Sequence, residues 1–199
     1  FKLRDVKILL HSHEHVDHVG GMARLQQLTG AQLIASPEAA AVFETGTTAP
    51  GDPQAGMHPP FPIVRANRVI RGGETVRLGS LALSAVDTKG HTQGALSWKW
   101  VSCDGAICRT IVYADSLTPV SRDDYRFADH PREVEAFRDS IRKVGELDCE
   151  ILLTPHPSAS AMRERMTGKK PLFDPAGCRD YAAALDKRLD DRLAKEAGK

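Results

Sequence analysis

The chain has 199 residues, and its 27 lysines and arginines nearly balance its 26 aspartates and glutamates to leave a formal net charge of +1. This length is enough for one domain with a sizeable core, which we place at residues 1–199. The charge balance lacks the basic surplus of proteins that bind nucleic acid through its phosphates. No apolar run reaches the roughly 18 residues needed to cross a bilayer. We therefore expect neither nucleic acid nor a membrane among its partners.

Apolar patterns in the first third of the chain predict alternating strands and helices. In chain order, the expected elements are strands at 6–10 and 32–35 and helices at 22–30 and 36–46. The second helix has Ser36 as a cap and a glycine at its end. The segment 47–62 is rich in Pro and Gly and has no apolar period, so it is either a loop that covers a site or a disordered surface loop.

The rest of the chain changes from a strand meander to a mixture of strands and helices. The expected elements are strands at 74–78, 81–86, 95–101 and 110–113, a helix from Pro131, a strand at 150–154 and a last helix with Tyr181, Leu185, Leu189 and Leu193 on one stripe. Strands and helices that alternate in this way indicate an α/β layered domain.

The four cysteines lie outside any Cys-x-x-Cys pair, which argues against a thiolate zinc finger. An even count fits two disulfides and an oxidising compartment, and the alternative is four reduced thiols. Cys103 and Cys108 flank a predicted hairpin tip, where a bridge is geometrically plausible.

The segment from His11 to His18 holds four of the eight histidines of the chain. It follows a predicted strand, and α/β folds tend to place their sites at the carboxyl ends of strands. His13 and His15 are two residues apart and can point to the same side, while Asp17 and His18 can face a second position. Imidazole and carboxylate are zinc ligands, so the spacing predicts a metal site rather than a solvated histidine-rich loop.

Two more histidines occur in turns that rigid elements position. His91 lies in a Gly-rich turn between two predicted strands, and His156 follows a buried strand between two prolines. Loop residues held by rigid elements are frequent site residues. His58 and His130 have no such frame, and we interpret them as surface residues.

Together these motifs resemble the metallo-β-lactamase superfamily. The residues that carry the resemblance are His13-x-His15-x-Asp17-His18, Gly90-His91-Thr92 and Thr154-Pro155-His156-Pro157. The segment 113–117 (Tyr-Ala-Asp-Ser-Leu), with Cys149 and Cys178, resembles the third subclass (B3) of true metallo-β-lactamases. The resemblance implies a four-layer αββα sandwich. It also implies that N-terminal strands of the family's domain precede Phe1 and are missing from this chain.

The resemblance further implies two zinc ions per chain. It assigns the first zinc to His13, His15 and His91, and the second to Asp17, His18 and His156. Ser116 stands where the first two subclasses use a cysteine ligand, so Ser116 and Thr118 are expected to bind the substrate carboxylate. Asp17 would also orient the nucleophile. A disulfide between Cys149 and Cys178 is implied as well.

Glu14 and His11 are not ligands in this motif, and we expect them to lie behind the ligands or to be solvated.

The implied activity is zinc-dependent hydrolysis of the β-lactam amide bond of penicillins, cephalosporins and carbapenems by a metal-bound hydroxide. The enzyme would be a monomer in the bacterial periplasm or secreted, with a small-molecule substrate as its partner. One alternative is another hydrolase of the same fold, a glyoxalase-type thioesterase or a lactonase, in which the aspartate at the place of Asp115 bridges both metals. The other is a structural zinc module, which six mixed ligands argue against.

Overall fold

A small parallel sheet forms in the N-terminal third of the protein. The computed structural model describes residues 2–198. Strands β1 (Ile8–Leu10), β2 (Gln32–Ala35) and β3 (Arg68–Val69) pair side by side in that order. The first strand is shorter than expected, because a 3-10 helix at Leu3–Asp5 precedes it, and β3 was not predicted.

Three helices connect these strands: α1 (Val16–Val19), α2 (Met22–Thr29) and α3 (Pro37–Thr45). The expected cap of α3 is present, since the Ser36 hydroxyl accepts a hydrogen bond from the Ala39 N–H at 3.2 Å. Gly46 ends α3 with a φ of 68°, the left-handed conformation that favours glycine. The bounds of α2, β2 and α3 confirm the predictions for this region.

The second sheet has five strands in the order β4-β5-β6-β7-β8. Their bounds are Thr75–Leu78, Leu81–Asp87, Leu96–Asp104, Ile107–Tyr113 and Ile151–Leu153. The first four form an antiparallel meander, and β8 pairs in parallel with β7. The β6–β7 hairpin extends to the predicted turn, where Cys103 and Cys108 form a disulfide. β6 and β7 are longer than expected, because pairing continues through exposed residues without alternating polarity.

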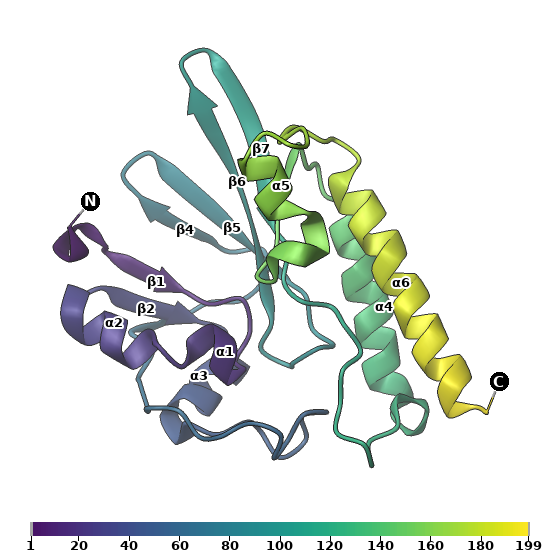
Figure 1. Cartoon of the computed structure of the whole chain (residues 1–199). Coiled ribbons are helices and arrows are strands. Elements are labelled where there is room, and N and C mark those ends of the chain that lie inside the picture. Colours follow the sequence, from purple (N-terminus) through teal and green to yellow (C-terminus); the bar gives the residue numbers. More distant parts are fainter. Residues whose placement is uncertain (1, 199) are drawn as a thin grey trace.

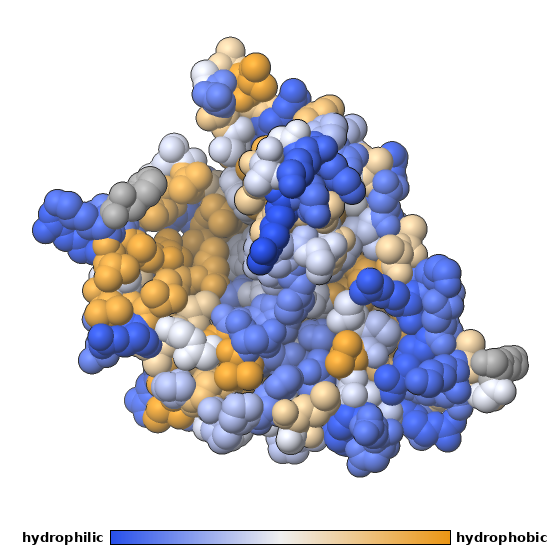
Figure 2. All heavy atoms as spheres, viewed as in Figure 1, coloured by the Kyte–Doolittle hydropathy of each residue, from blue (hydrophilic) through white to orange (hydrophobic). Residues whose placement is uncertain are grey.

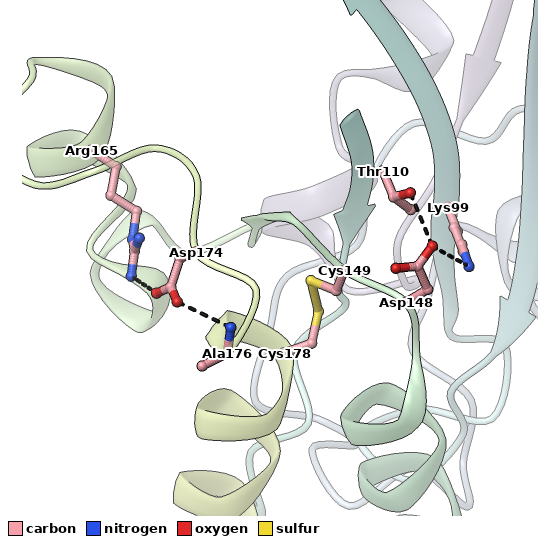
Figure 3. Close-up of a disulfide and its surroundings, with 8 residues drawn as sticks. All are labelled: Lys99, Thr110, Asp148, Cys149, Arg165, Asp174, Ala176 and Cys178. Carbon is pink, nitrogen blue, oxygen red and sulfur yellow. Dashed lines mark hydrogen bonds and ion pairs between the residues drawn. A yellow bond between two sulfur atoms is a disulfide. The ribbon is translucent and has the colours of Figure 1, made fainter. Parts of the chain in front are cut away.

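Two long helices, α4 (Pro131–Glu146) and α6 (Gly177–Glu196), pack against each other beside the second sheet (Figure 1). Arg138 on α4 pairs with Asp186 and Asp190 on α6. The short elements of this half are two 3-10 helices and one α-helix: Phe127–Asp129, Pro157–Ser160 and α5 (Met162–Met166). The disulfide Cys149–Cys178 links the start of α6 to the segment just before β8. Figure 3 shows it between two ion pairs, that of Asp174 with Arg165 and that of Asp148 with Lys99.

Three buried clusters define the layers. One cluster lies between the first sheet and α2 and α3 and includes Leu33 and Phe43, while a second lies between the two sheets and includes Ile34 and Trp98. The third lies between the second sheet and the pair α4 and α6. The order helices, sheet, sheet, helices is the four-layer αββα sandwich, so the predicted fold class is confirmed.

A cleft opens between the edge of the first sheet and the inner face of the second. It has a volume of about 570 Å³ and is lined on its apolar side by Leu10, Met22, Leu83, Trp98, Trp100 and Tyr113. Figure 2 shows hydrophobic residues gathered on one side of the hollow, over the N-terminal elements and the β4–β5 hairpin. One end of the cleft reaches Asp17, His18 and His156. None of the helices within residues 2–198 combines the length and apolar character needed to cross a bilayer.

Candidate metal centre

Three histidines from two loops converge in the interior. β1 ends at Leu10, and the residues that follow turn through His13 and His15 before α1 begins at Val16. His91 comes from the loop between β5 and β6. One ring nitrogen of each of His13, His15 and His91 lies within 4.8 Å of the others. All three are buried, at 0%, 1% and 6% exposure respectively. This arrangement is that of a three-histidine metal site.

The protein fixes which nitrogen of each ring is available. His13 Nδ1 lies 2.8 Å from Asp115 Oδ1, His91 Nδ1 lies 2.8 Å from the Thr118 carbonyl oxygen, and His15 Nε2 lies 3.2 Å from Asp52 Oδ1. An imidazole that donates one N–H presents the lone pair of its other nitrogen. The nitrogen that remains on His13, Nε2, is fully buried without a hydrogen-bond partner. An unpartnered buried donor atom facing two other imidazoles fits a metal ion.

A second group of donor atoms adjoins the first. Asp17, His18 and His13 each place a donor atom within 4.8 Å of the others. Asp17 Oδ2 lies 3.2 Å from His18 Nε2 and 3.9 Å from His156 Nε2. The rings of His18 and His156 stand 5.1 Å apart. The sequence-predicted residues of the second site therefore lie together, although His13 rather than His156 completes the tighter group.

The two groups differ in exposure. The side chains of Asp17 and His156 are 53% and 55% exposed, whereas the three-histidine group is buried. The outer nitrogen of His18, Nδ1, lies 3.0 Å from the Ser12 hydroxyl. A small molecule can thus reach Asp17 and His156 from solvent.

Burial sets the protonation of these groups. Desolvation lowers the pKa of His91 to about 3 and lowers the pKa of His13 well below its usual range. Burial works to raise the pKa of Asp17, but the neighbouring His18 and further favourable contacts lower it overall. At neutral pH His13 and His91 are unprotonated and the Asp17 carboxylate is ionised, which is the state in which each kind of group binds metals.

The loop that carries His91 is held in place by Glu14. The Glu14 carboxylate accepts hydrogen bonds from the Thr92 hydroxyl at 2.7 Å and from the Gly94 N–H at 2.9 Å. A side chain at Gly90 would lie 2.6 Å from the ring of Phe137, and the φ of 141° also favours glycine there. Glu14 is 3% exposed, so it lies behind the ligands and is not solvated.

Asp115 belongs to neither group of donor atoms among the described residues. It is fully buried on the outer side of His13, and burial raises its pKa to about 6. Ser116 is the next residue and is 3% exposed, and Thr118 contributes the carbonyl oxygen that accepts from His91. The segment after β7 therefore lies against the three-histidine group.

Two residues near the site, Asp52 and Gln54, were not predicted from the sequence. Both are buried in the segment 47–62, and Gln54 Nε2 lies 3.4 Å from His91 Nε2. This contact places the segment against the site, so it is a loop that covers the site rather than a disordered surface loop. Asp52 stands beside a turn proline in no distinctive sequence motif, and its contact with His15 joins residues 37 positions apart, so no local sequence signal indicated it.

Two further histidines differ from their predicted surroundings. His58 was interpreted as a surface residue, but it is half-buried, hydrogen-bonds Gln54 at 2.9 Å and lies with its ring 5.7 Å from that of His15. His11 is buried against Phe43 and accepts a hydrogen bond from the Ser36 N–H at 3.0 Å, so it is structural and not solvated. His130 is exposed, as expected, and stacks on Tyr125.

The sequence profile of the metallo-beta-lactamase superfamily matches residues 1–156, which contain every donor atom described above. The chain belongs to this superfamily. Among solved structures, the metallo-β-lactamase MIM-1 from Novosphingobium pentaromativorans is 46% identical and superimposes with a TM-score of 0.96. The match covers 100% of this chain and 73% of MIM-1. The MIM-2 metallo-β-lactamase is 53% identical with a TM-score of 0.92, over 98% of this chain and 72% of that one.

Another metallo-β-lactamase structure, the subclass B3 enzyme BJP-1 of Bradyrhizobium japonicum, is 30% identical with a TM-score of 0.86. The match covers 100% of this chain and 76% of BJP-1. These structures confirm the resemblance to the B3 subclass.

The curated relatives carry another name. A hydroxyacylglutathione hydrolase from Methylococcus capsulatus is 26% identical over 94% of this chain and 65% of its own length. A second, from Hyphomonas neptunium, is 26% identical over 52% of this chain and 33% of its own length. The chain thus spans less than two thirds of these curated relatives.

Proposed function

We propose that this protein is a zinc-dependent hydrolase that opens the amide bond of β-lactam antibiotics. Water is added across the strained amide, so that a C–O bond forms, the C–N bond breaks and the ring nitrogen takes up a proton. A pair of bound zinc ions would supply Lewis acidity and lower the pKa of water. The chain's own residues would hold the metals, orient the substrate and exclude bulk water.

The first zinc is assigned to His13, His15 and His91. Each of these histidines donates its outer N–H to an oxygen of the protein, which fixes the ring and the free nitrogen before a metal arrives. The second zinc is assigned to Asp17, His18 and His156. Asp17 lies within 3.2 Å of His18 Nε2 and 3.9 Å of His156 Nε2, which supports the proposal that it orients the nucleophile as well as binding the metal.

Ser116 and Thr118 are proposed to bind the substrate carboxylate through their hydroxyl groups. They lie on the segment that follows β7 and that is joined to His91 through the Thr118 carbonyl oxygen. Hydrogen bonds from this segment would orient the β-lactam ring toward the metal pair.

The position of Asp115 is the observation that carries the choice of substrate. In the alternative, a glyoxalase-type thioesterase or a lactonase, the aspartate at this place is expected to bridge both metals. Here Asp115 contacts the outer nitrogen of His13, and its oxygens lie outside both donor groups of the described residues. Similarity at 46% identity to a metallo-β-lactamase, against 26% to a hydroxyacylglutathione hydrolase, supports the same choice.

A periplasmic or secreted location and a monomeric state are part of this proposal. Two disulfides, Cys103–Cys108 and Cys149–Cys178, support an oxidising compartment. The nearly neutral charge supports a small-molecule substrate over nucleic acid.

The test is hydrolysis of a chromogenic cephalosporin by the zinc-loaded protein, with a hydroxyacylglutathione thioester assayed in parallel. We expect ring opening by the wild type and its loss in the double variant His13→Ala/His91→Ala. The matched control is His130→Ala, which removes an exposed histidine outside the site and is expected to retain activity. Turnover of the thioester without ring opening would replace the β-lactamase assignment by the thioesterase.

A further inference from the structure

A buried carboxylate from the segment 47–62 reaches the three-histidine group. Asp52 is 4% exposed, and both of its oxygens lie 3.2 Å from His15 Nε2. We propose that Asp52 is a positioning residue that orients His15 toward the first metal and couples the order of segment 47–62 to occupancy of that site. This inference rests on the proposed metal ligands.

The carboxylate is held in one orientation by its own turn. Asp52 Oδ1 also accepts a hydrogen bond from the Gln54 N–H at 2.7 Å, and the Asp52 N–H donates to the Ala49 carbonyl oxygen at 2.9 Å. Because the turn fixes the carboxylate, the contact with Nε2 also restrains rotation of the His15 ring. This leaves Nδ1 as the nitrogen that can join His13 and His91.

The segment is held on its other side by Arg122. The Arg122 guanidinium donates to the Asp52 carbonyl oxygen at 3.1 Å, and the Arg122 N–H donates to the Pro53 carbonyl oxygen at 3.0 Å. Residues 52–54 are therefore clamped between the histidines and the segment after β7. Among the described residues, the Asp52 side chain contacts one of the proposed ligand histidines, His15.

The coupling follows from the chemistry of imidazole. A metal on Nδ1 withdraws electron density and makes the Nε2–H a stronger donor, so the hydrogen bond to Asp52 is strengthened when the site is filled. Thermodynamic linkage requires the reverse effect to be equal: the contact that orders the segment must raise the affinity for the metal by the same factor. Loss of a partner of this kind costs about 10- to 100-fold in metal affinity.

The experiment measures zinc affinity by competition with a chromophoric chelator and hydrogen–deuterium exchange of peptides from 47–62, with and without zinc. In the wild type, zinc is expected to slow exchange in this segment. Asp52→Ala is expected to lose that protection and to bind the first zinc about 10- to 100-fold more weakly. Asp52→Asn, which keeps an acceptor oxygen without the charge, should lie between the two and serves if the alanine variant fails to fold.

The matched control is Asp104→Asn, which removes a carboxylate at the exposed tip of the β6–β7 hairpin and should leave both readouts unchanged. Unchanged zinc affinity and unchanged protection in Asp52→Ala would overturn the inference. This failure is distinct from failure of the proposed function, in which the wild type binds zinc and protects the segment but opens no cephalosporin.

Discussion

The two disulfides should differ in their contribution to stability, because they close loops of very different length. Cys149 and Cys178 are separated by 29 residues, whereas Cys103 and Cys108 are separated by 5. In the chain-entropy description, a cross-link lowers the entropy of the unfolded chain by an amount that grows with the logarithm of the loop length. The longer loop corresponds to about 3.6 kcal/mol at 25 °C and the shorter one to about 2 kcal/mol.

Packing enlarges this difference. Cys149 and Cys178 are 5% and 1% exposed and belong to the cluster between the second sheet and the helices, whereas Cys103 and Cys108 are exposed. Cys149→Ala/Cys178→Ala therefore also loses buried sulfur atoms from the core (Figure 3). We expect this double variant to lose at least about 1.5 kcal/mol more in free energy of unfolding than Cys103→Ala/Cys108→Ala.

Urea unfolding followed by tryptophan fluorescence measures both variants, since Trp98 and Trp100 lie on β6. With a slope of about 2 kcal/mol per molar urea, the midpoint should fall by about 1.8 M for the longer loop and about 1 M for the shorter one. The wild type in its oxidised form is the reference. An equal or larger loss for the hairpin disulfide would refute the argument from loop length.

Three further predictions concern single contacts. Asp115→Asn should weaken zinc binding by about 10- to 100-fold in a chelator competition, because His13 loses its charged partner; unaltered binding would count against the assigned ring orientation. Glu14→Ala leaves two buried donors unpaired and should cost about 3 kcal/mol in urea unfolding, and a change under 1 kcal/mol would contradict this role. Burial works to raise the pKa of Glu196, but hydrogen bonds, including those from the N–H groups of residues 127 and 128, lower it overall. The ionised carboxylate therefore stabilises the folded state at pH values above the ordinary carboxyl pKa, and this stabilisation is lost as the pH falls through the lowered pKa. Glu196→Gln should thus lower the melting temperature at pH 7 more than at pH 3, and an equal loss at both values would disprove the assignment.

The local chemistry of the chain predicted most of the fold. Apolar runs gave β1, β2 and β8, and the Ser36 cap and Gly46 bounded α3, because these features depend on neighbouring residues alone. The short β3 was missed, since two exposed residues carry no apolar pattern and pair only because β2 lies beside them. The four-residue helix α1 was also missed, and it forms from the turn of the histidine segment itself.

The candidate site was predictable where its residues follow strands. His13, Asp115 and His156 lie two or three residues beyond the ends of β1, β7 and β8, so the sheets bring together residues that are far apart in the sequence. The supporting contacts could not be predicted in the same way. Asp52 reaches His15 from a segment without periodicity, and the interior position of His11 depends on α3 packing over it. Such contacts are set by tertiary packing and leave no local signal.

Burial of the histidines also explains how the protein can hold several imidazoles close together without a metal and without repulsion between positive charges. Three protonated imidazoles at this separation would repel each other strongly in a low-dielectric interior. Burial instead lowers the pKa of His91 to about 3, so the ring stays neutral throughout the physiological range. A neutral imidazole whose outer N–H is already donated to Thr118 needs neither to lose a proton nor to rotate in order to bind a metal. The interior that makes His13 and His91 poor bases therefore also makes them ready ligands, whereas the exposed Asp17 and His156 remain the groups that a substrate can approach.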